Sequence, residues 1–139
     1  MMRVAALLLL AAPAHAWEFS PAPICTLTHA EGAADMKVTY DHATQLYAIA
    51  VTSAEGWPGA PAFSIRFDGA QPNTISTTRH STDANTLTVT DSGFGNVLDG
   101  LEFNSTATAF TQTAAVTMSL DGAAGPVQQF RACASAITS

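Results

Sequence analysis

Positive charge is scarce in this sequence. Only five of its 139 residues are Lys or Arg, against eleven Asp or Glu, which gives a formal net charge of −6. Binding to a nucleic-acid backbone depends on clustered Lys and Arg side chains that neutralise phosphates. So few scattered cations form no such cluster, and the sequence therefore predicts no nucleic-acid partner. Its acidity favours solubility or the attraction of a cationic partner.

Long apolar segments are also missing. The run at residues 4–12 is shorter than the about 20 residues that a transmembrane helix needs. Arg3 before this run and Ala-His-Ala at 14–16 match a secretory signal peptide with its cleavage site. We therefore expect residues 1–16 to be removed on export. Residues 17–139 should then form a single soluble domain without a membrane span, with four basic against eleven acidic residues.

Cysteine is limited to one pair, Cys25 and Cys133. In an exported chain such a pair predicts a disulfide, which would tie the first strand to the last element. In the chain-entropy model a closed loop of this length stabilises the fold by up to about 4–5 kcal/mol. A redox-active or metal-bound pair is the alternative, but the C-x-x-C spacing typical of that chemistry is absent. The expected location is the periplasm or the cell exterior.

The segment 92–100, Ser-Gly-Phe-Gly-Asn-Val-Leu-Asp-Gly, comes closest to a phosphate-binding loop. Its glycines give G-x-G-x-x-x-x-G, whereas dinucleotide folds use G-x-G-x-x-G within a parallel βαβ unit. No G-K-[ST] follows, which excludes a P-loop. We interpret the segment as a glycine turn, capped by Asp91 or Ser92, that leads into a short helix. Gly93 or Gly95 should then have a positive φ angle.

The sequence also lacks the residue spacings that are typical of metal sites and of catalytic serines. Zinc sites use close pairs such as H-x-x-x-H, whereas His29, His42 and His80 are widely separated, and we expect them to be solvated. The acidic residues beside the glycine turn lack the spacing of a calcium loop. No serine lies in G-x-S-x-G or S-x-x-K. The sequence predicts no cofactor, no metal ligands and no catalytic residues.

Apolar and polar residues alternate in several short segments, which is the pattern of half-buried β-strands. The clearest are residues 36–40, 63–68, 86–90 and 115–120, and weaker ones are 24–29, 45–52, 73–79 and 106–110. Turn residues separate them at 41–43, 55–59, 68–69, 81–85 and 121–122. About eight successive strands predict a mainly β domain, either an antiparallel sandwich or a partly open barrel.

Two segments depart from this alternation. Residues 96–103 place apolar side chains on one side of a short helix. Near the C-terminus, Pro126 suits the first turn of a helix, and apolar residues recur at helical spacing from Val127 to Ile137. We therefore expect a C-terminal helix that Cys133 holds to the first strand, with a final edge strand as the alternative.

One loop carries an aromatic residue suited to partner recognition. Trp57 and Pro58 lie within Gly-Trp-Pro-Gly-Ala-Pro at residues 56–61. Trp is enriched among the residues that contribute most to interfaces, which makes Trp57 and Pro58 candidate partner-binding residues. The alternative is that Trp57 folds back over one end of the sandwich, because Trp is highly buried on average.

Five stretches carry a resemblance to known proteins: WEFSPAPICTL, FSIRFDG, TIST, TLTVTDSGFGNVLDGLEF and QQFRAC. Together they resemble a group of small exported alphaproteobacterial proteins of unknown function, over residues 17–133. Some of these carry the name of an excinuclease ABC component, which implies a large cytoplasmic DNA-repair ATPase; the signal peptide, the acidity and the missing P-loop lysine do not fit that name. The C-terminal half also resembles the periplasmic invasion-associated locus B family. Neither resemblance implies catalytic residues.

Export, acidity and one disulfide, without a cofactor motif, predict a monomeric non-catalytic domain. It would bind an undetermined protein or envelope ligand, or have a structural role in the envelope. One alternative is an inhibitor of a cationic envelope enzyme, since an acidic surface attracts cations. Another is an unrecognised hydrolase or metal-binding enzyme that uses His29, His42 or His80.

Overall fold

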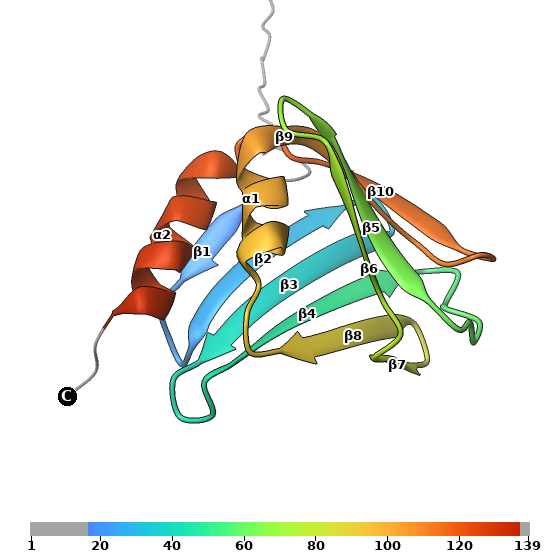
Figure 1. Ribbon diagram of the computed structural model, residues 1–139, viewed down its shortest axis with the longest axis horizontal. Coiled ribbons are helices and arrows are strands. Elements are labelled where there is room, and N and C mark those ends of the chain that lie inside the picture. The colour runs from blue at the N-terminus through green and yellow to red at the C-terminus, as the bar shows by residue number, and fades with distance from the viewer. Residues whose placement is uncertain (1–16, 137–139) are drawn as a thin grey trace, which may run out of the picture.

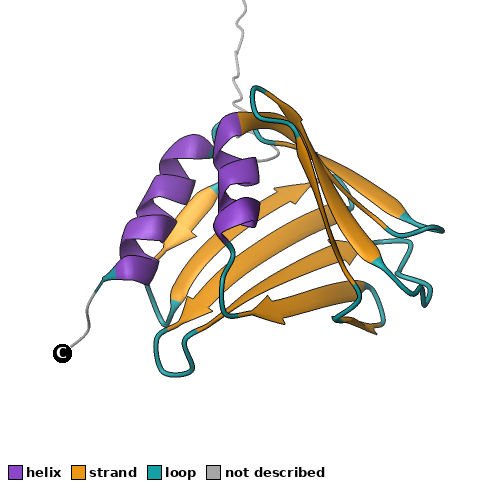
Figure 2. Ribbon diagram, viewed as in Figure 1, coloured by secondary structure: helices purple, strands orange, loops and turns teal. Residues whose placement is uncertain are grey.

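The computed structural model describes residues 17–136, so the expected signal peptide at 1–16 and Ile137 lie outside the described residues. Within them the chain forms ten strands and two helices (Figures 1 and 2). In chain order these are β1 (Glu18–Ser20), β2 (Cys25–Glu31), β3 (Ala34–Asp41), β4 (Leu46–Ser53), β5 (Phe63–Gly69), β6 (Asn73–Thr77), β7 (His80–Asp83), β8 (Thr86–Asp91), α1 (Gly95–Phe103), β9 (Asn104–Phe110), β10 (Ala115–Ser119) and α2 (Ala124–Ser135).

The strands form two antiparallel sheets that do not close into a barrel. The larger has the order β1-β2-β3-β4-β8-β7, and the smaller has the order β10-β9-β5-β6. Figure 1 shows the smaller sheet standing over one face of the larger one, with α1 and α2 at one end of the space between them. The predicted fold class, a mainly β antiparallel domain with a short helix and a C-terminal helix, is confirmed.

The core lies between the sheets and follows from the alternation of side chains along each strand. On β5, Phe63, Ile65 and Phe67 are buried, while Ser64 and Arg66 face outward. The larger sheet presents the matching apolar side chains of β2, β3, β4 and β8, and all of these join one continuous cluster. Each fully buried side chain of this size contributes about 1.5–3 kcal/mol to folding, so the two apolar faces hold the sheets together.

Two of the strands lack the alternation that predicts strands. β7 takes up residues 81–83 of the turn that was expected at 81–85, so that prediction is wrong for these three residues, and the turn is confined to residues 84–85. Its residues His-Ser-Thr-Asp are largely exposed, and it pairs with β8 through the backbone, from His80 opposite Val89 to Asp83 opposite Thr86. The other, β1, has three residues and forms the opposite edge of the sheet. Backbone pairing at an edge requires no apolar face, so the hydrophobic pattern carries no signal for either strand.

Helix α1 approaches the smaller sheet closely because it carries a glycine at the contact. A Cβ atom at Gly100 would overlap the ring of Phe67 on β5. α1 is also joined to α2, since Arg131 donates from Nη2 to Asp99 Oδ1 at 2.7 Å and from Nε to Glu102 Oε1 at 2.9 Å. Packing on one side and ion pairs on the other fix α1 across the end of the core.

The predicted disulfide between Cys25 and Cys133 is confirmed. It connects β2 to α2 across a Cα–Cα distance of 5.9 Å, and so holds the C-terminal helix against the edge of the larger sheet. Bonds of this kind persist in oxidising compartments outside the cytoplasm. Within residues 17–136 neither helix is long and apolar enough to cross a membrane.

A candidate ligand cavity between the sheets

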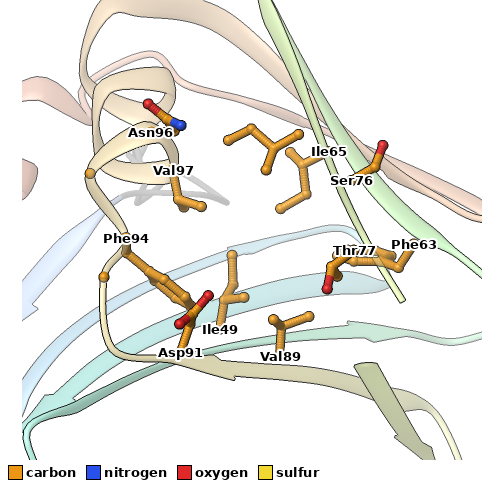
Figure 3. A pocket seen from close by; sticks show the side chains of 13 residues that line it. Ile49, Phe63, Ile65, Ser76, Thr77, Val89, Asp91, Phe94, Asn96 and Val97 are labelled. Atoms are coloured by element: carbon orange, nitrogen blue, oxygen red, sulfur yellow. The ribbon is translucent and has the colours of Figure 1, made fainter. Parts of the chain in front are cut away.

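A cavity of about 390 Å³ lies between β4 and β8 of the larger sheet and β5 and β6 of the smaller one. The segment that leads into α1 closes one end of it (Figure 3). Most of its side chains are apolar, and polar groups join them at a few points. The apolar ones are Ile49, Phe63, Ile65, Ile75, Val89, Phe94 and Val97. Cavities of about 300–1,000 Å³ with mainly apolar walls are typical of small-molecule sites.

Strand register places the apolar walls of the cavity. Ile49 on β4 lies opposite Val89 on β8, and Ile65 on β5 lies opposite Ile75 on β6. Ile49 and Ile65 are buried, whereas Ile75 and Val89 are half-buried although they pack against the core. The cavity therefore exposes apolar surface that a ligand could remove from water.

The glycine segment forms the end wall of the cavity, but without the expected backbone. Neither Gly93 nor Gly95 has a positive φ angle, so that prediction is wrong. Asp91 Oδ1 accepts a hydrogen bond from the Ser92 backbone N–H at 2.6 Å. Phe94 is the N-cap residue of α1 and no side chain caps this end of the helix, so neither Asp91 nor Ser92 caps it as predicted. A Cβ atom at either glycine would meet no atom within 4 Å. The glycines thus leave open space beside the cavity.

Phe94 is held in this end wall by an aromatic cluster. Its ring stacks on Tyr47 of β4 with centroids 5.4 Å apart, and Tyr47 also contacts Tyr40 at 4.5 Å and Phe130 of α2 at 6.3 Å. Burial and, secondly, the neighbouring Tyr40 raise the pKa of Tyr47, which Arg131 partly offsets. Tyr47 is therefore neutral at physiological pH, and the cluster packs as an apolar support behind Phe94.

Asp91 supplies the one charged side chain among the described residues that line the cavity. Its Oδ2 lies 3.4 Å from Nη2 of Arg79. The Asp91 and Arg79 side chains are 43% and 73% exposed, so water screens their attraction. Figure 3 shows Asp91 beside Phe94 at one end of the cavity, with Thr77 and Phe63 at the other. This end of the cavity therefore combines one accessible carboxylate with the ring of Phe94, which is itself buried.

The three histidines are placed apart and none lines the cavity. His29 is 2% exposed, so its expected solvation is wrong. It stacks on Trp17 at 4.4 Å, and its Nε2 lies 3.0 Å from Glu31 Oε1. His29 is buried because it lies on the inward face of β2, which it shares with the buried Cys25 and Leu27. That period of two is visible in the sequence and predicts an inward side chain.

His42 and His80 are half-buried at other places in the fold. His42 follows β3 and contacts Tyr40 edge-on at 4.9 Å. His80 begins β7, and its Nε2 lies 3.0 Å from the Ala60 carbonyl oxygen. Across residues 17–136 no group of three His, Cys, Asp or Glu side chains could hold a metal ion.

Trp57 takes the buried position that the alternative interpretation expected. It is 5% exposed, and its indole N–H donates to the Val51 carbonyl at 3.0 Å. Its ring meets Phe63 edge-on at 5.9 Å, so it supports a wall of the cavity from behind. Pro58 is exposed beside it. Partner binding by Trp57 and Pro58 stays a prediction.

Comparison with protein-family models, with curated proteins and with solved structures found no match to this chain. The resemblances described above therefore stay predictions. The fold and the site define a class by themselves, namely a disulfide-linked β domain of two sheets with an apolar cavity between them. Sequence reasoning missed this cavity, because its walls come from strands distant in sequence and only the glycine segment at its end stood out.

Proposed function

We propose that this protein is a non-catalytic, exported binding domain whose cavity between the sheets holds an apolar ligand. The observation that carries the proposal is the exposed apolar wall. Ile75 and Val89 stay half-buried although they pack against the core. A ligand that covers them would gain roughly 0.8 kcal/mol for each CH₂ group it buries, before the cost of its own ordering.

The chemistry of the cavity supports binding over catalysis. General acid–base catalysis places proton donors and acceptors within hydrogen-bond reach of the substrate. Among the described residues, the lining contains one carboxylate and no His, Lys, Cys or Tyr. Ser76 Oγ is engaged with Ser64 Oγ at 2.7 Å on the outer face of the sheet. The hypotheses of a hydrolase, of a metal enzyme and of an enzyme inhibitor stay predictions.

The location we propose is the periplasm or the cell exterior, with the domain acting as a monomer. The disulfide between Cys25 and Cys133 supports an oxidising compartment. The signal peptide expected at residues 1–16 agrees with this location. Among the charged groups that a ligand in this compartment could meet is Asp91, which lines the cavity and whose side chain is 43% exposed.

Titration calorimetry with octanol tests the proposed function, because octanol offers an apolar chain without a charge. We expect measurable binding by the wild-type protein. Val89→Phe adds a ring inside the cavity and should weaken binding at least about tenfold. Thr90→Phe adds the same ring on the exposed face of the same strand and should leave binding unchanged. Equal octanol affinity in both variants, each shown to be folded by circular dichroism, would contradict the proposal.

A further inference from the structure

The rim of the cavity carries a charge that can select among apolar ligands, and the inference drawn from it rests on the proposed function. We propose that the ligand is an amphiphile with an ammonium head group. Its apolar chain lies between the two sheets, against Ile49, Val89 and Ile75. Its ammonium group binds the carboxylate of Asp91, which lines the cavity and is 43% exposed to solvent.

Asp91 has room to accept this head group. It ends β8 and lines the cavity. Its Oδ1 accepts one hydrogen bond, from the Ser92 backbone N–H, and its Oδ2 faces only the guanidinium of Arg79 in the described part of the chain. An ionised carboxylate has about four acceptor positions. With 43% of the side chain exposed, acceptor positions stay open to an ammonium group that arrives from solvent.

Arg79 does not block the carboxylate. Its Nη2 is 3.4 Å from Asp91 Oδ2, longer than the about 2.7–2.9 Å of a strong charge-assisted hydrogen bond. Its side chain is 73% exposed, so it keeps its hydration when it moves away. A ligand ammonium that is partly shielded by the cavity wall gains more from Asp91 than this solvated arginine does, because screening by water weakens exposed pairs.

Phe94 adds a second feature that favours a cation. Phe94 lines the cavity together with Asp91, and the two are drawn at the same end of it in Figure 3. The ring of Phe94 stacks on Tyr47. The face of an aromatic ring attracts a cation placed within about 6 Å of its centre. A head group bound to Asp91 would therefore lie at the same end of the cavity as this ring, an arrangement that suits an alkylammonium group better than a carboxylate or a sulfate.

The charge of the whole domain acts in the same direction. Residues 17–139 contain four basic and eleven acidic side chains. Three of the four cations, Arg66, Arg79 and Arg131, already pair with carboxylates. The resulting negative field attracts cationic amphiphiles to the rim and repels anionic ones.

The test compares octylammonium, octanol and octanoate by titration calorimetry at low ionic strength. The three share one chain and differ in the head group. We expect octylammonium to bind about tenfold tighter than octanol, as one hydrogen bond to a charged group provides, and octanoate to bind most weakly. Added salt should reduce the preference for octylammonium and leave octanol binding nearly unchanged.

Two variants assign the preference to the rim. Asp91→Asn should lower the affinity for octylammonium to that for octanol. Unchanged octanol binding by the same variant would show that its cavity is intact. Asp83→Asn is the matched control, because it removes the same charge from an exposed position outside the cavity and should keep most of the preference. Arg79→Gln removes the competing cation and should tighten octylammonium binding.

The outcomes separate this inference from the proposed function. If octanol fails to bind the wild-type protein, the proposed function itself is wrong. If octanol binds but octylammonium binds no more tightly than octanol, the cavity is a ligand site and the proposed ammonium head group is wrong. The same holds if octylammonium binds more tightly than octanol and Asp91→Asn leaves that difference unchanged. Tighter binding of octanoate that Arg79→Gln abolishes would likewise overturn the proposed ammonium head group, in favour of an anionic ligand.

Discussion

Gly100 provides a sharp test of how α1 is placed across the end of the core. Replacing Gly100 with Ala adds a Cβ atom that would overlap the buried ring of Phe67. In an exposed helix the same substitution stabilises by about 1 kcal/mol. Overpacking a core commonly costs about 1–3 kcal/mol, and Phe67 is fully buried, so its ring has little space to yield. The overpacking cost should therefore lie in the upper part of that range, at about 2–3 kcal/mol. After subtraction of the helix gain of about 1 kcal/mol, we expect Gly100→Ala to lower the free energy of unfolding by about 1–2 kcal/mol.

Urea unfolding followed by circular dichroism measures this change, and the same helix offers a control. Gly95→Ala places a Cβ atom where nothing lies within 4 Å, so it should be neutral or stabilising by up to about 1 kcal/mol. Phe67→Leu offers a second check, because the smaller side chain should make room for the Gly100→Ala methyl group. Equal stabilisation by Gly100→Ala and Gly95→Ala would refute the close contact between α1 and β5.

Two further predictions concern the disulfide and the aromatic cluster. Replacing Cys25 and Cys133 together with Ala should lower the free energy of unfolding by about 2–4 kcal/mol; an unchanged urea midpoint would show that the bond does not hold α2 in place. Because burial raises the pKa of Tyr47, the folded state resists its ionisation, and stability should fall as pH rises above the ordinary tyrosine pKa of about 10. Unfolding at a series of alkaline pH values should show a smaller fall in Tyr47→Phe, and identical profiles would count against this account of the cluster.

The strands that build the core were predictable because their side chains alternate. Phe63, Ile65 and Phe67 carry the period of two that marks a half-buried strand, and the apolar stripe of α2 around Phe130 carries the helical period. The polar strand β7 was not predictable, because it pairs with β8 through the backbone and has no apolar face that the sequence pattern could show. The burial of His29 could have been predicted, because the apolar residues Cys25 and Leu27 show which face of β2 points inward.

The candidate site was much less predictable than the fold. Its walls bring Ile49 and Val89 from one sheet against Ile65 and Ile75 from the other, and a single sequence contains no signal for such pairings. The segment around Phe94 stands out in the sequence for its glycines, which by themselves indicate only a turn. That the segment forms the end wall of the cavity depends on how the two sheets and α1 pack against one another, which the segment's own residues do not show.

The central claim, that the cavity between the sheets binds an apolar ligand, is tested most directly by methyl NMR of the isoleucines during titration with octanol. Ile49, Ile65 and Ile75 line the cavity, whereas Ile24 lies outside it and serves as an internal control. We expect saturable shifts of the first three methyl groups with a common dissociation constant, and no saturable shift of Ile24. Unchanged cavity methyl signals, or shifts of all four to the same extent, would contradict the claim.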